Sequence, residues 1–184
     1  MFKLMNILVI NSVNELGFNI INNLIKENHK VLSIDNIIND DNIKYALSID
    51  NDNYSFYNGN ILNEGFIHVK LDYSIKQLYD EKIDYIIYIL DYNNYKNLPS
   101  LLFFDTCTSG MKNICYLSSK YKAKLLYVFD NEEINTIYKD GNNICNIYIK
   151  SYIEYCFINK MYFDYDIFDK SYILSKINEI FDKK

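Results

Sequence analysis

One stretch near the start of the chain restricts the fold more than any other. Residues 6–36 read NILVINSVNELGFNIINNLIKENHKVLSIDN. A buried strand is predicted at 6–10, an amphipathic helix at 16–29 and a second strand at 30–34, because apolar residues first run together and then recur at helical spacing. The order strand, turn, helix, strand is typical of a βαβ unit, in which the two strands pair in parallel.

Apolar runs and helical patterns alternate along the rest of the chain. Further strands are predicted at 54–60, 83–90, 124–129 and 165–168, and further helices at 74–82, 101–122, 146–160 and 171–181. Strands that alternate with helices in this way pair in parallel through right-handed crossovers. We therefore expect a doubly wound, mostly parallel α/β sheet of the Rossmann type, in a single domain over residues 1–184. The polar segment 35–53 predicts a flexible loop with one helical turn.

Composition excludes several classes of function. The chain has 184 residues, of which 49% are hydrophobic, and this is enough for one good core. All 19 basic residues are Lys and the net charge is −5, so we expect no nucleic-acid partner. No apolar run is long enough to cross a membrane, and no small-residue cleavage site follows the first strand. We expect no membrane span and a cytoplasmic location.

The cysteines and histidines do not form a metal-binding pattern. No pair of cysteines has the C-x-x-C spacing, and both histidines lie far from the cysteines in sequence. The residues concerned are Cys107, Cys115, Cys145, Cys156, His29 and His68. We predict buried free thiols and no metal site.

Residues 6–36 resemble the opening of the NAD(P)-dependent epimerase/dehydratase family, the extended short-chain dehydrogenases that modify nucleotide sugars. That family opens with a strand, then T-G-x-x-G-x-x-G, a helix, and a second strand ending in an acidic residue. Asn11, Asn14 and Gly17 occupy the three glycine positions, and Asp35 follows at the acidic position. The resemblance is best over residues 5–130. On this resemblance, residues 131–184 are the remnant of the catalytic helix, a sixth strand and a closing helix.

Later segments carry the resemblance further. Residues 56–63 look like the family's adenine-contacting segment, with Asn60 where Asp is usual. Tyr88 stands in the usual position of a His in the fourth strand, and 110–129 look like the family's G-T-x-N helix and fifth strand.

The resemblance implies a nucleotide site with Asn in place of glycine. Its cofactor-binding residues would be Asn11, Asn14, Leu16, Gly17, Asp35 and Asn60. Asn tolerates the left-handed backbone, so Asn11 and Asn14 can keep the path of the glycine loop. The Asn14 side chain would, however, occupy the space where pyrophosphate approaches bare backbone. Asp35 favours NAD over NADP as the cofactor. We expect the binding of NAD to be weak or lost, because Asn replaces glycine in the loop. An ordinary βαβ corner without a ligand stays open, as does the reading of Asp35 as the start of a polar loop.

The catalytic residues of the family are incompletely present. The family uses a Tyr acid/base, a Lys four residues later, and a Ser or Thr at the end of the fifth strand. Lys150 stands at the Lys position, but Asn146 stands where the Tyr belongs. Phe129 or Asp130 replaces the hydroxyl residue, and an anion there would repel a tyrosinate.

Three other Tyr-x-x-x-Lys pairs occur in the chain, against roughly two expected by chance from its Tyr and Lys content. They are Tyr92/Lys96, Tyr116/Lys120 and Tyr172/Lys176. Tyr116 lies in the helix before the fifth strand, which is the wrong element. Tyr172/Lys176 is the rival catalytic pair, and it would require 131–171 to be an insertion.

The family also carries a substrate-binding region after its sixth strand, and only residues 169–184 stand there in this chain. We therefore predict a degenerate, non-catalytic relative that acts as a structural or protein-interaction subunit with a protein partner. Two alternatives stay open. One is a sensor that binds NAD or another nucleotide without turnover. The other is an active NAD-dependent nucleotide-sugar epimerase/dehydratase or related oxidoreductase.

Overall fold

Six parallel strands form one sheet at the centre of the part of the chain that the structure describes. The computed structural model describes residues 4–36, 40–80, 82–90, 100–129, 164–169, 172–173 and 177. The strands are β1 (Asn6–Ile10), β2 (Lys30–Asp35), β3 (Tyr54–Asn58), β4 (Tyr85–Leu90), β5 (Lys124–Phe129) and β6 (Tyr165–Asp169). They pair in the order β3-β2-β1-β4-β5-β6, and every pairing is parallel. The predicted doubly wound sheet is confirmed.

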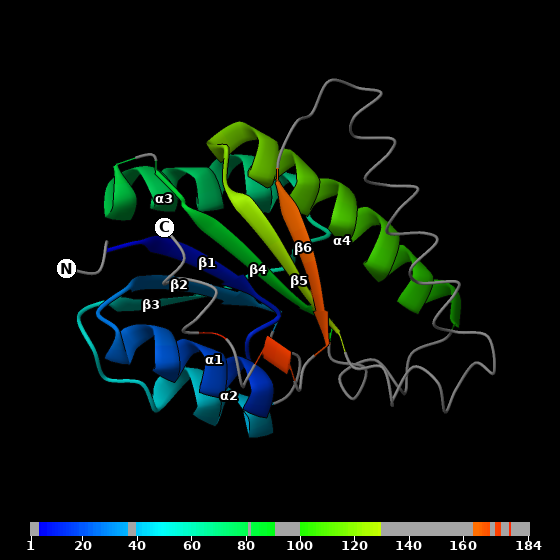
Figure 1. Cartoon of the computed structure of the whole chain (residues 1–184). Coiled ribbons are helices and arrows are strands. Elements are labelled where there is room, and N and C mark those ends of the chain that lie inside the picture. The colour runs from blue at the N-terminus through cyan, green and yellow to red at the C-terminus, as the bar shows by residue number, and fades with distance from the viewer. Residues whose placement is uncertain are drawn as a thin grey trace.

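Helices cover both faces of the sheet. They are α1 (Glu15–Lys26), α2 (Asp40–Leu47), the π-helical η1 (Phe66–Leu71), α3 (Asp72–Tyr79) and α4 (Ser100–Tyr121). The helices α3 and α4 lie on one face, and α1 and α2 lie on the other (Figure 1). The predicted helix at 146–160 lies outside the described residues. Of the predicted helix at 171–181, only Tyr172, Ile173 and Ile177 are described, and all three are helical.

Two expectations about local structure need correction in the extent of the helix. The segment predicted as a flexible loop with one helical turn contains α2, whose eight residues make more than two turns. Tyr45 of α2 packs against Phe18 of α1, with ring centroids 5.7 Å apart, and Ala46 is buried. This packing stabilises a helix that the polar sequence of the segment did not predict.

The helix predicted at 74–82 begins earlier and ends sooner. Helical structure starts at Glu64, directly before η1, and continues into α3, which ends at Tyr79. Ile67, Leu71 and Ile75 recur every four residues and are all buried, so one continuous apolar face explains the early start. Asp80 ends the helix in the left-handed conformation, with φ of 51°.

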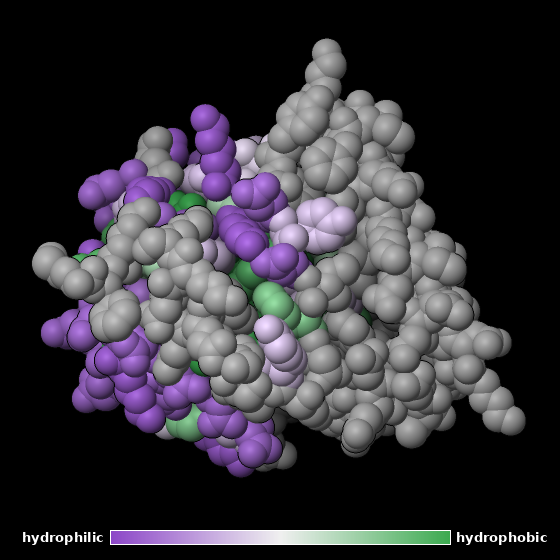
Figure 2. Space-filling model, viewed as in Figure 1, coloured by the Kyte–Doolittle hydropathy of each residue, from purple (hydrophilic) through white to green (hydrophobic). Residues whose placement is uncertain are grey.

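The sheet separates two hydrophobic layers. Along β1, Leu8 and Ile10 belong to the core beneath η1, α3 and α4, whereas Ile7 and Val9 belong to the core against α1. Both layers are buried, which explains why the central strands read as uninterrupted apolar runs. Hydrophilic residues gather over α1 and α2 on the face seen in Figure 2, so this part of the described surface is mostly polar.

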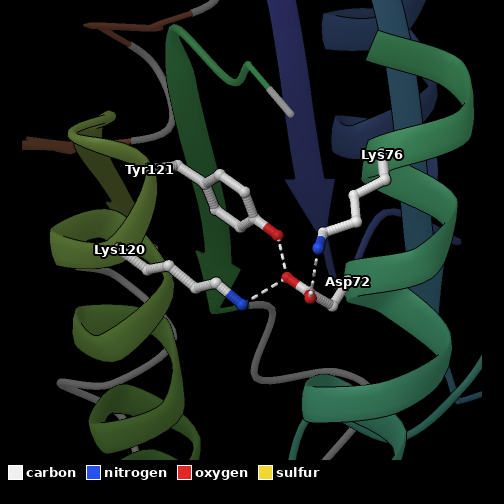
Figure 3. A network of polar contacts seen from close by, with 4 residues as sticks. All are labelled: Asp72, Lys76, Lys120 and Tyr121. Carbon is white, nitrogen blue, oxygen red and sulfur yellow. Dashed lines mark hydrogen bonds and ion pairs between the residues drawn. The ribbon is translucent and has the colours of Figure 1, made fainter. Parts of the chain in front are cut away.

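A polar cluster ties α3 to the end of α4. The Asp72 carboxylate accepts hydrogen bonds from the Lys120 ammonium and the Tyr121 hydroxyl, and Lys76 lies 4.0 Å away (Figure 3). Burial raises the pKa of the Asp72 carboxyl, but the hydrogen bonds from Lys120 and Tyr121 and the charges of Lys120 and Lys76 outweigh burial. The pKa of Asp72 therefore lies below its usual value. We call these four residues the Asp72 cluster.

We expect Asp72→Asn to lower the free energy of unfolding by about 1 kcal/mol at pH 7, because the hydrogen bonds lose their charged acceptor. A carboxyl whose folded pKa is depressed stabilises the fold above its unfolded pKa, and this stabilisation is lost as the pH falls through the folded value. The difference between variant and wild type should therefore narrow below about pH 4. Urea unfolding of both proteins at pH 7, 5 and 3 measures this difference in the free energy of unfolding.

The matched control is Glu64→Gln, which neutralises the exposed partner of Lys112 in a 3.2 Å ion pair. This change should cost less than about 0.5 kcal/mol, as is usual for a surface pair. A difference for Asp72→Asn that stays constant from pH 7 to pH 3 would contradict the role assigned to its charge.

Candidate functional site

The carboxyl ends of β1, β2 and β3 meet at one edge of the sheet. In parallel sheets this edge carries the ligand sites, at the start of the helix that follows the first strand. The turn after β1 is held to β2 by a hydrogen bond from the Asn11 amide to the Ile34 carbonyl, at 2.9 Å. Gly59 after β3 likewise donates its amide to the Asp35 carbonyl at 2.9 Å. The structure therefore brings the predicted residues Asn11, Asp35 and Asn60 to the ends of three neighbouring strands.

Only one of the two asparagines adopts the left-handed backbone. Asn11 has φ of 58°, as predicted for a residue in a glycine position. Asn14 has φ of −151° and is extended, so the prediction that it shares this role is wrong. Its extended backbone is instead that of a helix N-cap residue.

Asn14 caps α1 with its own side chain. Its Oδ1 accepts a hydrogen bond from the Gly17 amide at 2.7 Å, and its Nδ2 donates to the Asn11 carbonyl at 3.0 Å. Asn14 is buried, with only 6% of the residue exposed. The carboxamide thus occupies the start of the helix, and it takes one of the amides that a helix N-terminus can offer to an anion. Glu15, in the first turn, adds a negative charge at the same helix end.

Gly17 allows α1 to approach the turn closely. A β-carbon at this position would lie 2.2 Å from the carbonyl oxygen of Ser12, which is a backbone atom. The expectation that this glycine serves close packing is confirmed. Leu16, next to it, is half-buried and packs against the core on the α1 side of the sheet.

Asp35 binds the turn after β1. Its Oδ2 accepts a hydrogen bond from the Val13 amide at 2.7 Å. Part of the carboxylate's hydrogen-bonding capacity is therefore used to hold the turn in place. The same bond keeps a negative charge beside the start of α1.

Asn60 folds back onto its own segment. Its Oδ1 accepts the Leu62 amide at 2.8 Å, which closes a local turn after β3. Asn113 of α4 donates from Nδ2 to the Ile61 carbonyl at 2.7 Å and fixes the same turn from the helix side. The side-chain oxygen of Asn60 is therefore engaged in shaping the backbone.

Two polar groups in the turn after β1 lack partners in the described part of the chain, and sequence reasoning missed one of the two residues, Ser12. Ser12 is buried, and within the described residues neither its hydroxyl nor the Nδ2 of buried Asn11 has a hydrogen-bond partner. A buried polar group without a partner is unusual and points to a water or ligand atom beside it. Ser12 follows no motif, so only the three-dimensional structure identifies it.

The catalytic candidates are only partly described. Lys150 and Lys176 lie outside the described residues. Tyr172 is 49% exposed and stacks on Phe168, with ring centroids 5.4 Å apart and planes at 9°. Whether Tyr172 and Lys176 form a pair stays a prediction.

Two other tyrosines singled out in the sequence analysis, Tyr88 and Tyr116, pack against other aromatic side chains. Tyr88 lies in the core against Tyr127, with ring centroids 5.7 Å apart. Tyr116 meets His68 edge to face at 4.5 Å, and its sequence partner Lys120 belongs to the Asp72 cluster. Tyr92 and Lys96 lie outside the described residues.

Neither a metal site nor a membrane helix is found in the described part of the chain. No group of three or more His, Cys, Asp or Glu residues there could hold a metal ion. None of the described helices combines the length and apolar character needed to cross a membrane. Cys115 is a buried free thiol, as predicted.

The strand order and the parallel pairing define a Rossmann-like α/β fold. Solved structures of epimerases share it. UDP-glucose 4-epimerase of Thermotoga maritima, solved with UDP-glucose, matches with a TM-score of 0.64 at 18% identity, over 89% of this chain and 54% of its own. The resemblance in fold expected from residues 6–36 is confirmed.

Two further structures agree. The enzyme WbmH of Bordetella bronchiseptica, in complex with NAD⁺, matches with a TM-score of 0.62 at 17% identity, over 91% of this chain and 56% of its own. Epimerase Mth375 of Methanothermobacter thermautotrophicus matches with a TM-score of 0.59 at 16% identity, over 91% and 51%. The chain thus spans about half the length of these proteins. No family model and no curated protein matches the sequence.

Proposed function

We propose that this chain is a degenerate, non-catalytic relative of the epimerase/dehydratase enzymes that acts in the cytoplasm as a structural or protein-interaction subunit. The observation that carries the proposal is the cap on α1. The Asn14 carboxamide accepts the Gly17 amide at 2.7 Å, so the helix start is stabilised without a phosphate. The parallel sheet and the close packing at Gly17, which the fold needs, are retained.

The residues at this helix start fit a dinucleotide pyrophosphate poorly. The phosphate would have to displace the Asn14 carboxamide, and losing such a cap costs about 1 kcal/mol. It would also approach Glu15 in the first turn, and Asp35 beside the Val13 amide. Repulsion between these like charges adds to the cost of placing a pyrophosphate at the start of α1.

The sequence of the catalytic segments supports the same proposal. Asn146 cannot act as the acid/base that Tyr provides in the family, and Phe129 or Asp130 replaces the hydroxyl that orients the substrate. A subunit that acts through protein contacts needs the folded sheet but does not need the catalytic residues. The chain shows this combination.

A nucleotide sensor is the second candidate. It is favoured by the buried Asn11 Nδ2 and Ser12 hydroxyl, which lack partners among the described residues beside the start of α1. These groups and Asp35 would hold a nucleotide without turning it over. On this hypothesis Asp35→Ala abolishes binding.

Calorimetric titration with NAD⁺, NADH and NADP⁺ tests the main proposal. We expect no binding by the wild-type protein at up to about 1 mM cofactor. Asn14→Gly uncovers the Gly17 amide and should strengthen NAD⁺ binding at least about tenfold. The matched control is Asn51→Gly. Asn51 likewise accepts a backbone amide, that of Asn53 at 2.8 Å, but it precedes β3 at the opposite edge of the sheet.

Two outcomes would overturn the proposal. Wild-type binding below about 100 μM would favour the sensor, and its loss in Asp35→Ala would identify the carboxylate as the ribose contact. Turnover of a nucleotide sugar would show an enzyme, and Tyr172→Phe would then decide whether the rival pair of Tyr172 and Lys176 carries it.

A further inference from the structure

The strand β3 forms one edge of the described sheet, where it pairs with β2 alone (Figure 1). Two hydrogen bonds show which of its residues face β2. The Val31 amide donates to the Asn53 carbonyl at 2.7 Å, and the Gly59 amide donates to the Asp35 carbonyl at 2.9 Å. Backbone groups alternate in direction along a strand, so the odd-numbered residues of β3 bond to β2. The N–H and C=O groups of its even-numbered residues therefore point away from the sheet.

Phe56 has open backbone groups at this edge. The Tyr54 amide already donates to the Asn51 carbonyl at 3.0 Å, so the start of the edge is closed by its own turn. Across the described ranges of the chain, neither the N–H nor the C=O of Phe56 has a hydrogen-bond partner. Tyr57 and Asn58, which follow it, are exposed, so solvent reaches this edge. One donor and one acceptor on the same residue are therefore available to another strand.

No charged side chain protects this edge. Residues 53–61 include neither a charged residue nor a proline. The strand β6, at the other edge of the described sheet, has the same length but carries Asp166 and Asp169. Charges and prolines on an edge strand oppose its pairing with another chain. Two copies of this chain, each with a net charge of −5, can therefore bring their β3 strands together without like charges meeting there.

A second copy of β3 fits this edge better than a flexible peptide does. In an antiparallel pair about a two-fold axis, Phe56 of one copy lies opposite Phe56 of the other, and the two residues exchange both hydrogen bonds. A peptide would gain the same two bonds but would lose conformational entropy on binding, whereas β3 is already ordered by β2. The two-fold pair also brings two phenylalanine rings together, because side chains directly opposite each other lie on the same face of a sheet.

We propose that the chain self-associates through an antiparallel β3–β3 pair centred on Phe56, which joins two six-stranded sheets into one. This inference rests on the proposed function as an interaction subunit and names its partner, a second copy of the chain. The contact is small, so the dimer is weak, with a dissociation constant of about 100 μM. The two proposals fail separately, because NAD⁺ binding would not remove the β3 pair and a monomeric chain would not create NAD⁺ binding.

Analytical ultracentrifugation of the full chain between about 10 μM and 1 mM tests the proposal. We expect the wild-type protein to dimerise in this range. Phe56→Lys and Phe56→Glu should each weaken association at least about tenfold, because two like charges then face each other across the two-fold axis. An equimolar mixture of the two variants should restore a dimer, because opposite charges then meet at the same place.

Tyr165→Lys is the matched control. It makes the same kind of aromatic-to-lysine change on β6, at a residue that is 38% exposed, and should leave the dissociation constant unchanged. Three results would overturn the proposal. They are a wild-type protein that stays monomeric at about 1 mM, unchanged association of Phe56→Lys, and a mixture of the two folded Phe56 variants that does not associate.

Amide hydrogen exchange of the wild-type protein decides the matter without a variant. The Phe56 amide points away from β2, whereas the Tyr57 amide faces β2 and is protected in the monomer. Raising the protein concentration from about 50 μM to about 1 mM should slow exchange of the Phe56 amide about threefold, which is the fall in monomer fraction for the expected dissociation constant. Exchange of the Tyr57 amide should stay nearly the same. A Phe56 amide whose exchange does not depend on concentration would refute the pair, even if the protein dimerised through another surface.

Discussion

Gly17→Ala is expected to lower the free energy of unfolding by about 3 kcal/mol, because it forces a methyl group into backbone that cannot yield. The new β-carbon would lie 2.2 Å from the carbonyl oxygen of Ser12 and 2.7 Å from its carbonyl carbon. The turn after β1 cannot move away easily. It is held by the hydrogen bonds of the Asn11 amide to Ile34 and of the Val13 amide to Asp35.

Urea unfolding followed by circular dichroism measures the effect. Gly65→Ala is the matched control, since a β-carbon there meets only the Asn63 Oδ1, at 3.3 Å. Gly65 has an ordinary helical backbone with φ of −63°. The control should therefore change stability by less than about 1 kcal/mol. Equal losses in the two variants would refute the explanation by close approach.

Leu8→Ala should cost about 3 kcal/mol through the cavity that it leaves in the core. Leu8 is 0% exposed and lies on β1, whose neighbours β2 and β4 fix the backbone on both sides. The space cannot close fully, because β1, which carries residue 8, is held by a neighbouring strand on each side.

The same denaturation experiment with Leu47→Ala supplies the comparison. Leu47 ends α2 and is 70% exposed, so the identical chemical change there should stay within about 0.5 kcal/mol. If Leu47→Ala proved as costly as Leu8→Ala, the assignment of the core would be wrong.

The strands and the long helices could be predicted because burial leaves a clear pattern in sequence. Residues 85–90 are apolar or aromatic throughout and form a strand that is buried on both sides. The helix α2 could not be predicted in this way. Its sequence is polar, and its stability comes from contacts such as that of Tyr45 with Phe18, which join elements far apart in the chain.

The candidate site was predicted only in position. The sequence pattern placed Asn11, Asn14 and Asp35 at the strand ends. It could not show which hydrogen-bond partner each of these side chains has. Asn serves equally as a left-handed residue and as a helix cap, and the two roles need different backbone angles. The structure assigns the first role to Asn11 and the second to Asn14.

The position of β1 at the centre of the sheet has a consequence for how the chain folds. Ile7 pairs with Val31, 24 positions later (31 − 7), and with Tyr85, 78 positions later (85 − 7). Closing the longer separation costs more chain entropy, so we expect β1, β2 and β3 to assemble before β4 arrives. Until then β1 is an unprotected apolar edge that can pair with another copy. Refolding yield should therefore fall as protein concentration rises, even though the finished sheet leaves β1 covered on both sides.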